Sequence, residues 1–344
     1  MSDKIKVLVV DDSFLFRSYM MKELSSFDDI EVVGLAMDAE EARVKISDLK
    51  PDVVTLDIEM PGMNGIDFLK KYLNEYKLPF IVVTSKPEYA FDAMSAGAID
   101  FVKKSLMRTS DDGDSFIRKL VNRIRVAKSA KIRTLNNRFE AVANTSSSDN
   151  IRSNGSGKII ALGASTGGTE ALIEVVKKLP ANSPPVVIVQ HMPANFTKLY
   201  AARMNSCCPM SVKEAEDGDR LTNGQVIIAA GEFHLTLEKD ARGYYVKSRR
   251  GEKVSGHCPS VDVLFESVAR TAGKDAVGAI LTGMGSDGAE GLLKMRNSGA
   301  YTIGQDEETC VVYGMPGVAY KIGAVMKQLP LERIAEEILT KVNV

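Results

Sequence analysis

The sequence predicts two α/β domains, each built on a mainly parallel β-sheet, and three observations carry that prediction. The chain has 344 residues, which suits two domains because domains cluster near about 100–200 residues. In both halves, short apolar runs alternate with apolar positions at helical spacing, a pattern typical of βαβ units. A polar segment rich in Gly and Ser lies between the halves, as expected for a tether.

The first domain is predicted to span residues 1–127. Five short apolar runs are its expected strands: Ile5–Val10, Glu31–Leu35, Val53–Leu56, Phe80–Thr84 and Ile99–Val102. Apolar residues at helical spacing lie between them, as in Phe14–Leu24 and Ile66–Tyr72. An apolar stripe marks the last helix, formed by Phe116, Ile117, Leu120, Val121 and Ile124. Buried parallel strands with helices on both faces make a doubly wound sheet.

The tether is predicted over residues 128–157, where polar, Gly/Ser-rich sequence cannot bury enough apolar surface to fold. A basic stretch leads into it, because residues Arg118 to Arg138 include eight basic side chains and no acidic one. Two interpretations of this stretch stay open. It forms either a solvated helix face that runs into the tether, or a docking surface for an acidic partner.

The second domain is predicted over residues 158–344. Its three buried strands are expected at Ile159–Ala164, Pro184–Gln190 and Ala276–Thr282. Further strands, some of them antiparallel, are indicated at Val226–Ala230 and Tyr244–Lys247. Helices are expected over Glu170–Leu179, Gly288–Asn297 and Ile334–Leu339. Both domains therefore fall in the same α/β class.

Composition excludes several classes of protein. The 44 basic and 45 acidic residues give a formal net charge of −1, which removes the electrostatic case for general nucleic-acid binding. The cysteines include no CxxC pair, so neither a disulfide framework nor structural zinc is expected. No apolar run approaches the ~20 residues of a membrane span, and the N-terminus lacks a signal-peptide core. We expect a cytoplasmic protein with no direct membrane insertion.

Five polar residues are expected to meet at the carboxyl edge of the first sheet. Asp11 and Asp12 directly follow the first strand, and Asp57 directly follows the third. Three neighbouring carboxylates repel one another unless a cation neutralises them, and Mg²⁺ prefers such oxygen ligands. A carboxylate beside Mg²⁺ can attack a phosphoryl group and become an aspartyl phosphate. Thr84, which ends the fourth strand, and Lys104, which follows the fifth, are the expected contacts of the phosphoryl oxygens.

These residues lie in motifs that resemble a two-component receiver domain over residues 3–127. The matching segments are Val9-Val-Asp-Asp-Ser, Leu56-Asp-Ile-Glu-Met-Pro-Gly-Met-Asn-Gly, Val83-Thr-Ser and Ala96-Gly-Ala-Ile-Asp-Phe-Val-Lys-Lys. The resemblance implies a flavodoxin-like fold and phosphorylation of Asp57 by a histidine kinase. It also implies Mg²⁺ held by Asp12, Asp57 and the backbone of Glu59, with Asp11 assisting.

The same resemblance implies roles for residues near the last two strands of the first domain. Thr84 and Phe101 correspond to the family's switch residues, and Lys104 corresponds to its phosphate-contacting lysine. The chain departs from the family at Ser105, where the usual residue is a proline that is often cis. The geometry of that peptide therefore stays open.

A glycine-rich turn in the second domain presents a candidate nucleophile. Gly163-Ala-Ser-Thr-Gly-Gly joins a strand to a helix and fits the G-x-S-x-G elbow pattern. The glycines permit a tight turn that presents Ser165 Oγ at the sheet edge, beside a positively polarised helix N-terminus. Gly/Ser turns also cradle phosphates, although this segment is neither a GxGxxG nor a P-loop motif. A non-catalytic nucleotide- or phosphate-binding module therefore stays open as an alternative.

The partners expected of Ser165 are a base and a carboxylate at neighbouring strand ends. Of the chain's three histidines, His191 directly follows a buried strand and would reach the same edge as Ser165. His234 is expected in a hairpin or loop, and His257 in a loop where it is a candidate substrate contact. Asp287 follows another buried strand, where it caps the next helix, orients the base, or does both. Hydroxyl, imidazole and carboxylate are expected to touch in sequence.

Residues 158–343 resemble the chemotaxis protein-glutamate methylesterase family, usually called CheB. The matching segments are Gly163-Ala-Ser-Thr-Gly-Gly, Gln190-His-Met-Pro-Ala-Asn-Phe-Thr, His257-Cys-Pro-Ser-Val-Asp, Leu281-Thr-Gly-Met-Gly-Ser-Asp-Gly and Gly314-Met-Pro. The resemblance implies hydrolysis of glutamate methyl esters on methyl-accepting chemotaxis receptors, releasing methanol, and deamidation of receptor glutamines. It implies no cofactor for the ester reaction and a chemotaxis histidine kinase as phosphodonor. Where the family usually has Asn, this chain has Ser286.

The expected mechanism is that of a serine hydrolase. Ser165 attacks, His191 transfers the proton, and Asp287 orients the imidazole. Backbone N–H groups near Thr166 and Met284 are the candidate oxyanion hole. In the family the unphosphorylated receiver packs over the esterase cleft, so phosphorylation is expected to relieve a block. A DNA-binding output domain is the weakest alternative, because the second domain has no basic recognition helix.

Overall fold

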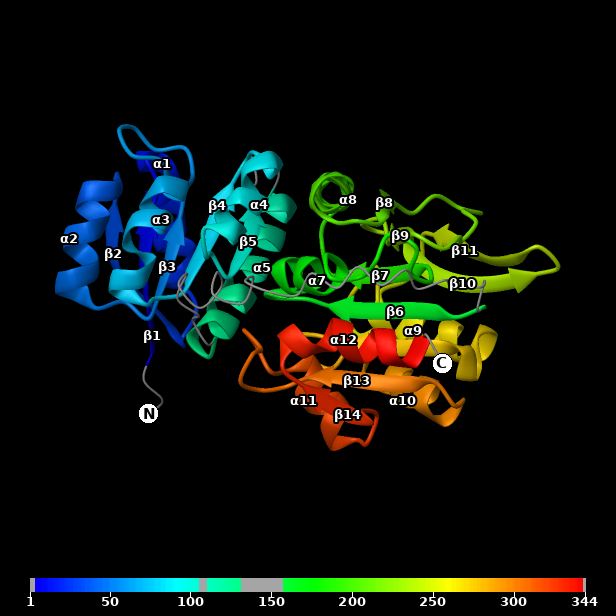
Figure 1. Ribbon diagram of the computed structural model, residues 1–344. Helices are drawn as coiled ribbons and strands as arrows, with labels where there is room; N and C mark the ends of the chain where they lie inside the picture. Colours follow the sequence, from blue (N-terminus) through cyan, green and yellow to red (C-terminus); the bar gives the residue numbers. More distant parts are fainter. Residues whose placement is uncertain (1–3, 105–109, 131–156, 343–344) are drawn as a thin grey trace. The chain divides into compact units, whose positions relative to one another are not determined.

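The computed structural model describes residues 4–104, 110–130 and 157–342, and the chain divides into two units, Met1–Ala143 and Asn144–Val344 (Figure 1). Each unit has its own parallel sheet among the described residues. The α/β fold class predicted from the sequence is therefore confirmed for both units. The predicted domain bounds stay predictions, because most of the expected tether lies outside the described residues.

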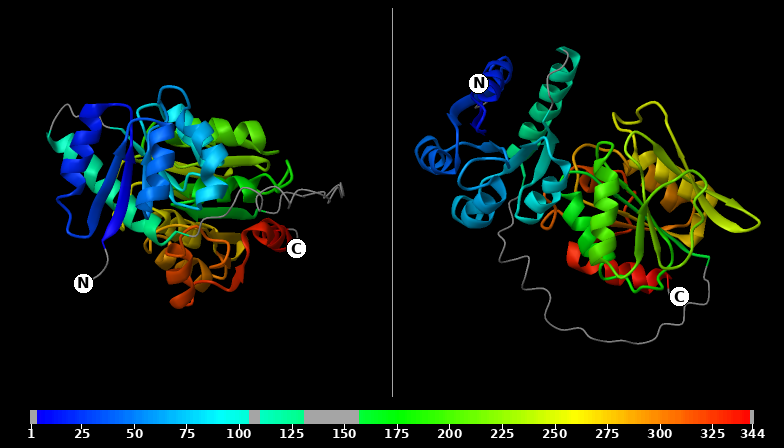
Figure 2. Two further views of the ribbon diagram at one scale, coloured as in Figure 1. Left: turned by 90° about the vertical axis from the view of Figure 1, so that its left-hand side faces the viewer. Right: turned by 90° about the horizontal axis from the view of Figure 1, so that it is seen from above.

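The described residues of the first unit form a five-stranded parallel sheet in the order β2-β1-β3-β4-β5. Its strands are β1 (Ile5–Val10), β2 (Ile30–Ala36), β3 (Val53–Leu56), β4 (Phe80–Thr84) and β5 (Asp100–Lys103). Its helices are α1 (Phe14–Leu24), α2 (Ala39–Leu49), α3 (Gly65–Tyr76), α4 (Pro87–Ser95) and α5 (Ser110–Lys128). Helix α1 contacts α5, while α3 contacts α2 and α4, so two rows of helices cover the two faces (Figure 2). The expected bounds of β1, β3 and β4 are confirmed, and β5 begins one residue later than expected.

Local signals keep the loops that carry the acidic residues short. Helix α1 begins directly after the first acidic pair because the Ser13 hydroxyl accepts the Phe16 N–H at 3.3 Å. Helix α3 begins with Gly65, where an added Cβ would lie 2.3 Å from the Asp57 carbonyl oxygen. Glycine is therefore needed for α3 to start against the end of β3.

The basic stretch before the tether pairs with acids of its own unit wherever the structure shows a partner. Arg123 lies 2.6 Å from Asp100, Arg125 lies 2.7 Å from Asp29, and Lys128 lies 2.6 Å from Asp52; these are the N–O distances of three ion pairs. This favours the interpretation as an ordinary helix face for these three residues. Residues 131–138 of the stretch lie outside the described residues.

The second unit is a seven-stranded sheet in the order β14-β13-β12-β6-β7-β9-β8, with every pairing parallel. Its strands are β6 (Ile159–Ala164), β7 (Val186–Gln190), β8 (Ser211–Glu214), β9 (Gln225–Ile228), β12 (Ala276–Ile280), β13 (Tyr301–Gln305) and β14 (Lys327–Leu329). A separate antiparallel hairpin joins β10 (His234–Asp240) to β11 (Gly243–Arg249). The expectation of some antiparallel pairing is thus confirmed for β11, whereas the strand expected at Val226–Ala230 is the parallel β9.

Helices cover both faces of this sheet. They are α7 (Gly168–Val176), α8 (Phe196–Cys207), α9 (Val261–Thr271), α10 (Ala289–Asn297), α11 (Met315–Lys321) and α12 (Leu331–Val342). Helix α7 packs beside α8 and α12, while α9 packs against α10 and the β10–β11 hairpin in one large apolar cluster (Figure 1). In the described ranges, no helix is both long and apolar enough to cross a bilayer.

Candidate active site and candidate metal centre

The three residues expected to form a triad follow three adjacent strands of the second sheet. Ser165 follows β6, His191 follows β7, and Asp287 lies in the loop after β12. Strand β6 lies between the other two, and all three are parallel. The chain runs from β6 to β7 on one side and from the neighbouring β12 to β13 on the other. Strands β6 and β12 therefore flank the switch point where open α/β sheets bind ligands.

Ser165 lies on a tight turn that is held in place by hydrogen bonds to neighbouring backbone groups. Its N–H donates to the Thr282 carbonyl at 3.0 Å, and its carbonyl accepts the Gly168 N–H at 2.7 Å. The turn passes through Gly167 at φ +76°, a conformation that favours glycine. Ser165 is 5% exposed. An added Cβ at Gly283 would lie 2.8 Å from Ser165 Cβ, so the loops after β6 and β12 are in direct contact.

His191 and Asp287 are joined as expected. The imidazole Nε2–H donates to Asp287 Oδ2 at 2.6 Å, and both residues are buried. The other ring nitrogen, Nδ1, is buried without a hydrogen-bond partner in the part of the chain that the structure describes. No hydrogen bond links Ser165 Oγ to the ring among these residues, so the expected hydroxyl–imidazole contact is not made here. Such contacts are often long before substrate binds.

The Asp287 carboxylate is held by the N-terminus of α9. It accepts the Ser260 hydroxyl at 2.7 Å, the Val261 N–H at 2.7 Å and the Asp262 N–H at 3.1 Å. Burial opposes ionisation, yet the His191 contact and these donors lower the pKa of Asp287 to about 2. The carboxylate is therefore ionised at neutral pH and accepts the ring N–H. In the neutral imidazole, that pairing leaves Nδ1 as the nitrogen without a proton.

The contacts from Ser260 to Asp262 were not predicted from the sequence. The segment His257-Cys-Pro-Ser-Val-Asp carried part of the family resemblance, and a Ser before an apolar run is a helix-start signal. Neither observation indicates that this helix end would meet a carboxylate from another loop. Burial raises the pKa of the neighbouring Asp262 side chain, whose Oδ1 accepts the Gly291 N–H at 2.7 Å.

The other two histidines lie beside this segment. His234 begins β10; its Nδ1 accepts the Ser260 N–H at 3.3 Å and its Nε2 donates to the Glu252 carbonyl at 2.7 Å. The expectation of a hairpin position for His234 is confirmed. The ring of His257 stacks on that of His191, with centroids 3.7 Å apart and an interplanar angle of 5°.

The candidate oxyanion donors lie on the two loops nearest the serine. Thr166 follows Ser165 and is buried, and its carbonyl accepts the Thr282 hydroxyl at 3.0 Å. Met284 follows Gly283, and its side chain is exposed. Two loops in contact can therefore offer backbone N–H groups on either side of the nucleophile. Their use as an oxyanion hole stays a prediction.

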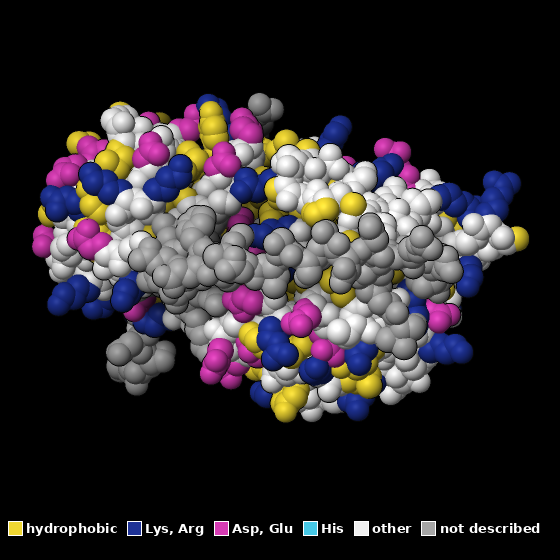
Figure 3. Space-filling view, viewed as in Figure 1, with side chains coloured by type: hydrophobic (Ala, Val, Ile, Leu, Met, Phe, Trp, Pro, Cys, Tyr) yellow, Lys and Arg dark blue, Asp and Glu magenta, His cyan; other side chains and the backbone are white. Residues whose placement is uncertain are grey.

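The glycines of the Ser165 turn are closely packed against protein atoms. An added Cβ would lie 2.2 Å from a Val261 methyl group at Gly163, 2.6 Å from Val311 at Gly167, and 2.2 Å from Gln190 Oε1 at Gly168. Close packing against neighbouring protein atoms therefore accounts for the three glycines without a bound anion. On the face shown in Figure 3, Lys/Arg and Asp/Glu side chains are interspersed over the second unit, a distribution unlike the basic patch of a DNA-binding domain.

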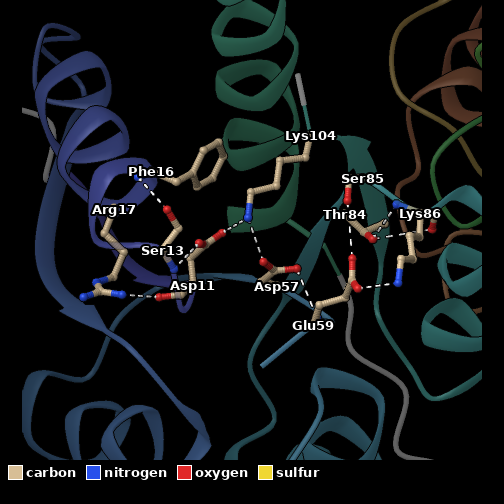
Figure 4. A network of polar contacts seen from close by, with 10 residues as sticks. All are labelled: Asp11, Ser13, Phe16, Arg17, Asp57, Glu59, Thr84, Ser85, Lys86 and Lys104. Atoms are coloured by element: carbon tan, nitrogen blue, oxygen red, sulfur yellow. Dashed lines mark hydrogen bonds and ion pairs between the residues drawn. The ribbon is translucent and has the colours of Figure 1, made fainter. Parts of the chain in front are cut away.

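A second constellation lies at the carboxyl edge of the first sheet (Figure 4). Asp11 follows β1 and Asp57 follows β3, and both side chains are buried. The Lys104 ammonium lies 2.6 Å from Asp11 Oδ2 and 2.7 Å from Asp57 Oδ2. It also lies 4.3 Å from the centre of the Phe16 ring. Burial lowers the pKa of Lys104, but its hydrogen bonds to the two carboxylates outweigh this and raise the pKa overall.

The acidic residues of this edge fit a hard cation. Ligand oxygens of Asp11, Asp12 and Asp57 all lie within 4.8 Å of one another. The pKa of Asp11 is raised to about 6, mainly because the side chain is buried and also because Asp57 repels its charge. The Lys104 hydrogen bond lowers this pKa but does not outweigh the other two causes. The Glu59 N–H donates to Asp57 Oδ1 at 3.2 Å, which places its backbone at the site. Crowded carboxylate oxygens with one lysine between them are donors of the kind that Mg²⁺ accepts.

The structure also places the expected switch and phosphate-contact residues. Thr84 ends β4 and is buried, and its Oγ1 accepts the Lys86 N–H at 3.0 Å. Phe101 is buried in β5, with its ring edge-on to Phe91 at 6.0 Å between centroids. The Lys104 N–H donates to the Thr84 carbonyl at 2.8 Å. Ser105 lies outside the described residues.

Comparisons with known proteins find matches to both units. A family profile described as CheB methylesterase matches residues 160–338, and one described as response regulator receiver domain matches residues 7–110. A "protein-glutamate methylesterase/protein-glutamine glutaminase 2" of Syntrophomonas wolfei is 50% identical over 99% of this chain and 98% of its own length. The corresponding protein of Salmonella typhimurium is 43% identical over 99% of this chain and 97% of its own length.

A solved structure agrees with these sequence matches. The crystal structure of the Thermotoga maritima CheB methylesterase catalytic domain is 39% identical and covers 53% of this chain and 97% of its own length. Its TM-score is 0.52. The second unit is therefore similar to a catalytic domain in fold as well as in sequence.

Proposed function

The chain belongs to the CheB methylesterase family and carries a response regulator receiver domain, and we propose from this that it is a phosphorylation-regulated protein-glutamate methylesterase. It hydrolyses glutamate methyl esters on methyl-accepting chemotaxis receptors, releasing methanol. It also deamidates receptor glutamines, because the same chemical steps then release ammonia. The observation that carries the mechanism is the 2.6 Å hydrogen bond between His191 and Asp287, next to the strand that delivers Ser165.

In the proposed reaction, Ser165 Oγ attacks the ester carbonyl carbon while His191 Nδ1 takes the hydroxyl proton. The ionised Asp287 holds the ring by its Nε2–H and stabilises the positive charge that forms. The imidazolium then gives its proton to the departing methoxide, so methanol leaves and an acyl-serine remains. Water repeats the two proton transfers with His191, releasing glutamate and restoring the serine. N–H groups near Thr166 and Met284 stabilise the oxyanion.

The receiver residues are proposed to take up a phosphoryl group from a chemotaxis histidine kinase. Asp11, Asp12 and Asp57, with the backbone of Glu59, would hold Mg²⁺, which neutralises the negative charge of the phosphoryl oxygens when it is bound. The Asp57 carboxylate attacks the phosphorus atom while the bond from phosphorus to the histidine nitrogen of the kinase breaks, which leaves an aspartyl phosphate and the free histidine. The Lys104 ammonium, already between two carboxylates, binds a phosphoryl oxygen, as does the hydroxyl of the switch residue Thr84. Phe101 is the second proposed switch residue.

The test of the proposed function is methanol release from methylated receptor membranes by a Ser165→Ala protein. The variant removes the nucleophile while keeping the turn, so activity should fall to background. A Ser286→Ala protein is the matched control, because that serine is exposed on the Asp287 loop and has no proposed role. Methanol release that survives Ser165→Ala would leave a non-catalytic binding module as the better account of the second unit.

A further inference from the structure

The parallel stack of His257 on His191 is a contact that the reaction scheme does not use. Its centroid separation of 3.7 Å and angle of 5° place one imidazole flat against the other. His191 is held in its own plane by a single hydrogen bond, from Nε2 to Asp287. One in-plane hydrogen bond still lets the ring pivot about that bond. A flat neighbour on one face removes that freedom.

The backbone of His257 is fixed by a two-residue hairpin turn. The Val254 N–H donates to the His257 carbonyl at 3.0 Å, and the His257 N–H donates to the Val254 carbonyl at 2.9 Å. The central residues Ser255 and Gly256 have φ of +52° and +82°, the signs required by a type I′ turn. A serine rarely adopts positive φ, and such conformations persist where the surroundings impose them.

The same segment is tied to the carboxylate of the triad. His234 accepts the Ser260 N–H, and the Ser260 hydroxyl donates to Asp287 at 2.7 Å. The Ser255 hydroxyl donates to Asp262 at 3.3 Å. Residues 254–262 therefore contact the base through one ring and the carboxylate through the start of α9, so they set the two groups relative to each other.

We propose that His257 is a positioning residue that fixes the ring plane of His191, an inference that rests on the function proposed above. With the ring plane fixed, Nδ1 keeps one direction in which it takes the proton from the serine hydroxyl and then gives it to the leaving group. The stack also suits the charged state, because a cationic imidazolium is attracted to the face of a neutral aromatic ring. His257 acts through His191 and takes no proton in the reaction.

The test compares three substitutions in the full-length chain by steady-state methanol release and by melting temperature. His257→Ala removes the stack and should lower kcat by about 10–100-fold with little change in KM, because the effect is on alignment and not on substrate binding. His257→Phe keeps a flat ring without ring nitrogens and should recover kcat to within about threefold. Val254→Ala, on the other side of the same turn with an exposed side chain, should match the unaltered protein.

If His257→Ala lowers the melting temperature as well as the rate, His257→Leu is used in its place. Leucine fills the space of the histidine side chain but has no flat ring. The proposal is supported if His257→Phe has a kcat near that of the unaltered protein while the kcat of His257→Leu is lowered. Equal kcat for the Ala, Leu and unaltered proteins would overturn it, and so would equal losses for Phe and Leu, because ring nitrogens would then be what matters. Failure of the proposed function is a separate result, since it appears as methanol release that persists in Ser165→Ala.

Discussion

The two sites of this chain occupy equivalent places in their sheets but arrange charge in opposite ways. The receiver site gathers three acidic side chains, and the pKa of Asp11 is raised to about 6 by burial. The esterase site surrounds one carboxylate with donors, which lower the pKa of Asp287 to about 2 despite its burial. The site proposed to take up a cation and a phosphoryl group therefore has more carboxylates than the one lysine beside them can balance, whereas the carboxylate of the proposed triad is held by hydrogen-bond donors of its own unit.

The largest expected effect comes from replacing Asp287, the carboxylate that is held by hydrogen-bond donors of the second unit. Asp287→Asn should lower kcat for methanol release by about 10⁴-fold, because an amide cannot hold the ring in the tautomer that leaves Nδ1 unprotonated. Steady-state kinetics on methylated receptor membranes measure this. Asp262→Asn is the matched control, since Asp262 neighbours Asp287 but makes no hydrogen bond to His191, and its loss should be far smaller. Equal losses would place the effect in the packing between the start of α9 and the Asp287 loop, and not in the carboxylate–imidazole contact.

The next largest effect concerns the acidic site of the first unit and its control over methanol release. Asp57→Asn removes the phosphoryl acceptor, so a small phosphodonor such as acetyl phosphate should no longer stimulate methanol release, while the basal rate is unchanged. Asp52→Asn, at an acid paired with Lys128 on the same unit, should leave stimulation intact. Stimulation that survives Asp57→Asn would place the regulatory phosphoryl group elsewhere.

A fragment of residues 158–344 tests whether the first unit inhibits methanol release, separately from whether its phosphorylation stimulates it. It should be faster than the unphosphorylated full-length chain and insensitive to phosphodonor, because phosphorylation must favour one arrangement of the two units to have any effect. Equal rates at matched concentration would remove the inhibitory part of the regulation.

A smaller effect concerns stability. Lys104→Ala leaves two buried carboxylates without their counter-charge, so the free energy of unfolding of the receiver should fall by about 3 kcal/mol. Added Mg²⁺ should recover part of that loss, since a ligand that binds the folded state stabilises it. Calorimetry with and without Mg²⁺ measures both. Lys86→Ala, which breaks an exposed pair with Glu59, should have no measurable effect, and an equal loss there would contradict the assignment.

The smallest effect is the opposite pH dependence of the two carboxylates. The pKa of Asp287 is depressed to about 2 from 3.8, so it contributes about 2 kcal/mol of stability above pH 4, lost as pH falls toward 2. The pKa of Asp11 is raised to about 6, so its ionisation destabilises the receiver as pH rises from 4 to 6. Melting temperatures of Asp287→Asn and Asp11→Asn against the unaltered chain should therefore diverge in opposite directions. Parallel pH profiles would contradict the contrast.

Sequence reasoning located the residues that follow strands. Ser165 and His191 each come directly after an apolar run of the second sheet, and Asp57 comes directly after one of the first. Parallel strands of one sheet deliver their carboxyl ends to one edge, so the convergence of Ser165 with His191, and of Asp57 with Asp11, is predictable. The contact of Ser260 with Asp287 is different, because the two residues are 27 apart and meet only where α9 packs under the sheet edge. The stack of His257 on His191 has the same origin. Periodicity carries no information about such contacts.

The elements that the sequence pattern missed include the helices α8, α9 and α11 as well as several short strands. Strands β8 and β14 have four and three residues, too few for an alternation pattern to be distinguished from a loop. Strand β13 was missed although it is buried along most of its length. Its sequence, Tyr-Thr-Ile-Gly-Gln, is mixed in polarity, since Thr302 and Gln305 are buried polar residues. Strand β13 pairs directly with β12, and its Gln305 side chain accepts the Thr282 N–H at 2.8 Å, so it borders the loop that carries Asp287. Strands β8 and β14 do not neighbour any of the three strands that carry the triad.

The order in which the triad strands occur along the chain has a consequence for synthesis. His191 and Asp287 are 96 residues apart, and Ser260, which steadies the carboxylate, also comes after the histidine. A ribosome therefore releases the hydroxyl and the imidazole well before the acid that aligns them. A polypeptide translated only as far as His191 has the serine and the imidazole without the carboxylate, so the proposed triad is complete only after residue 287 of 344 has been added.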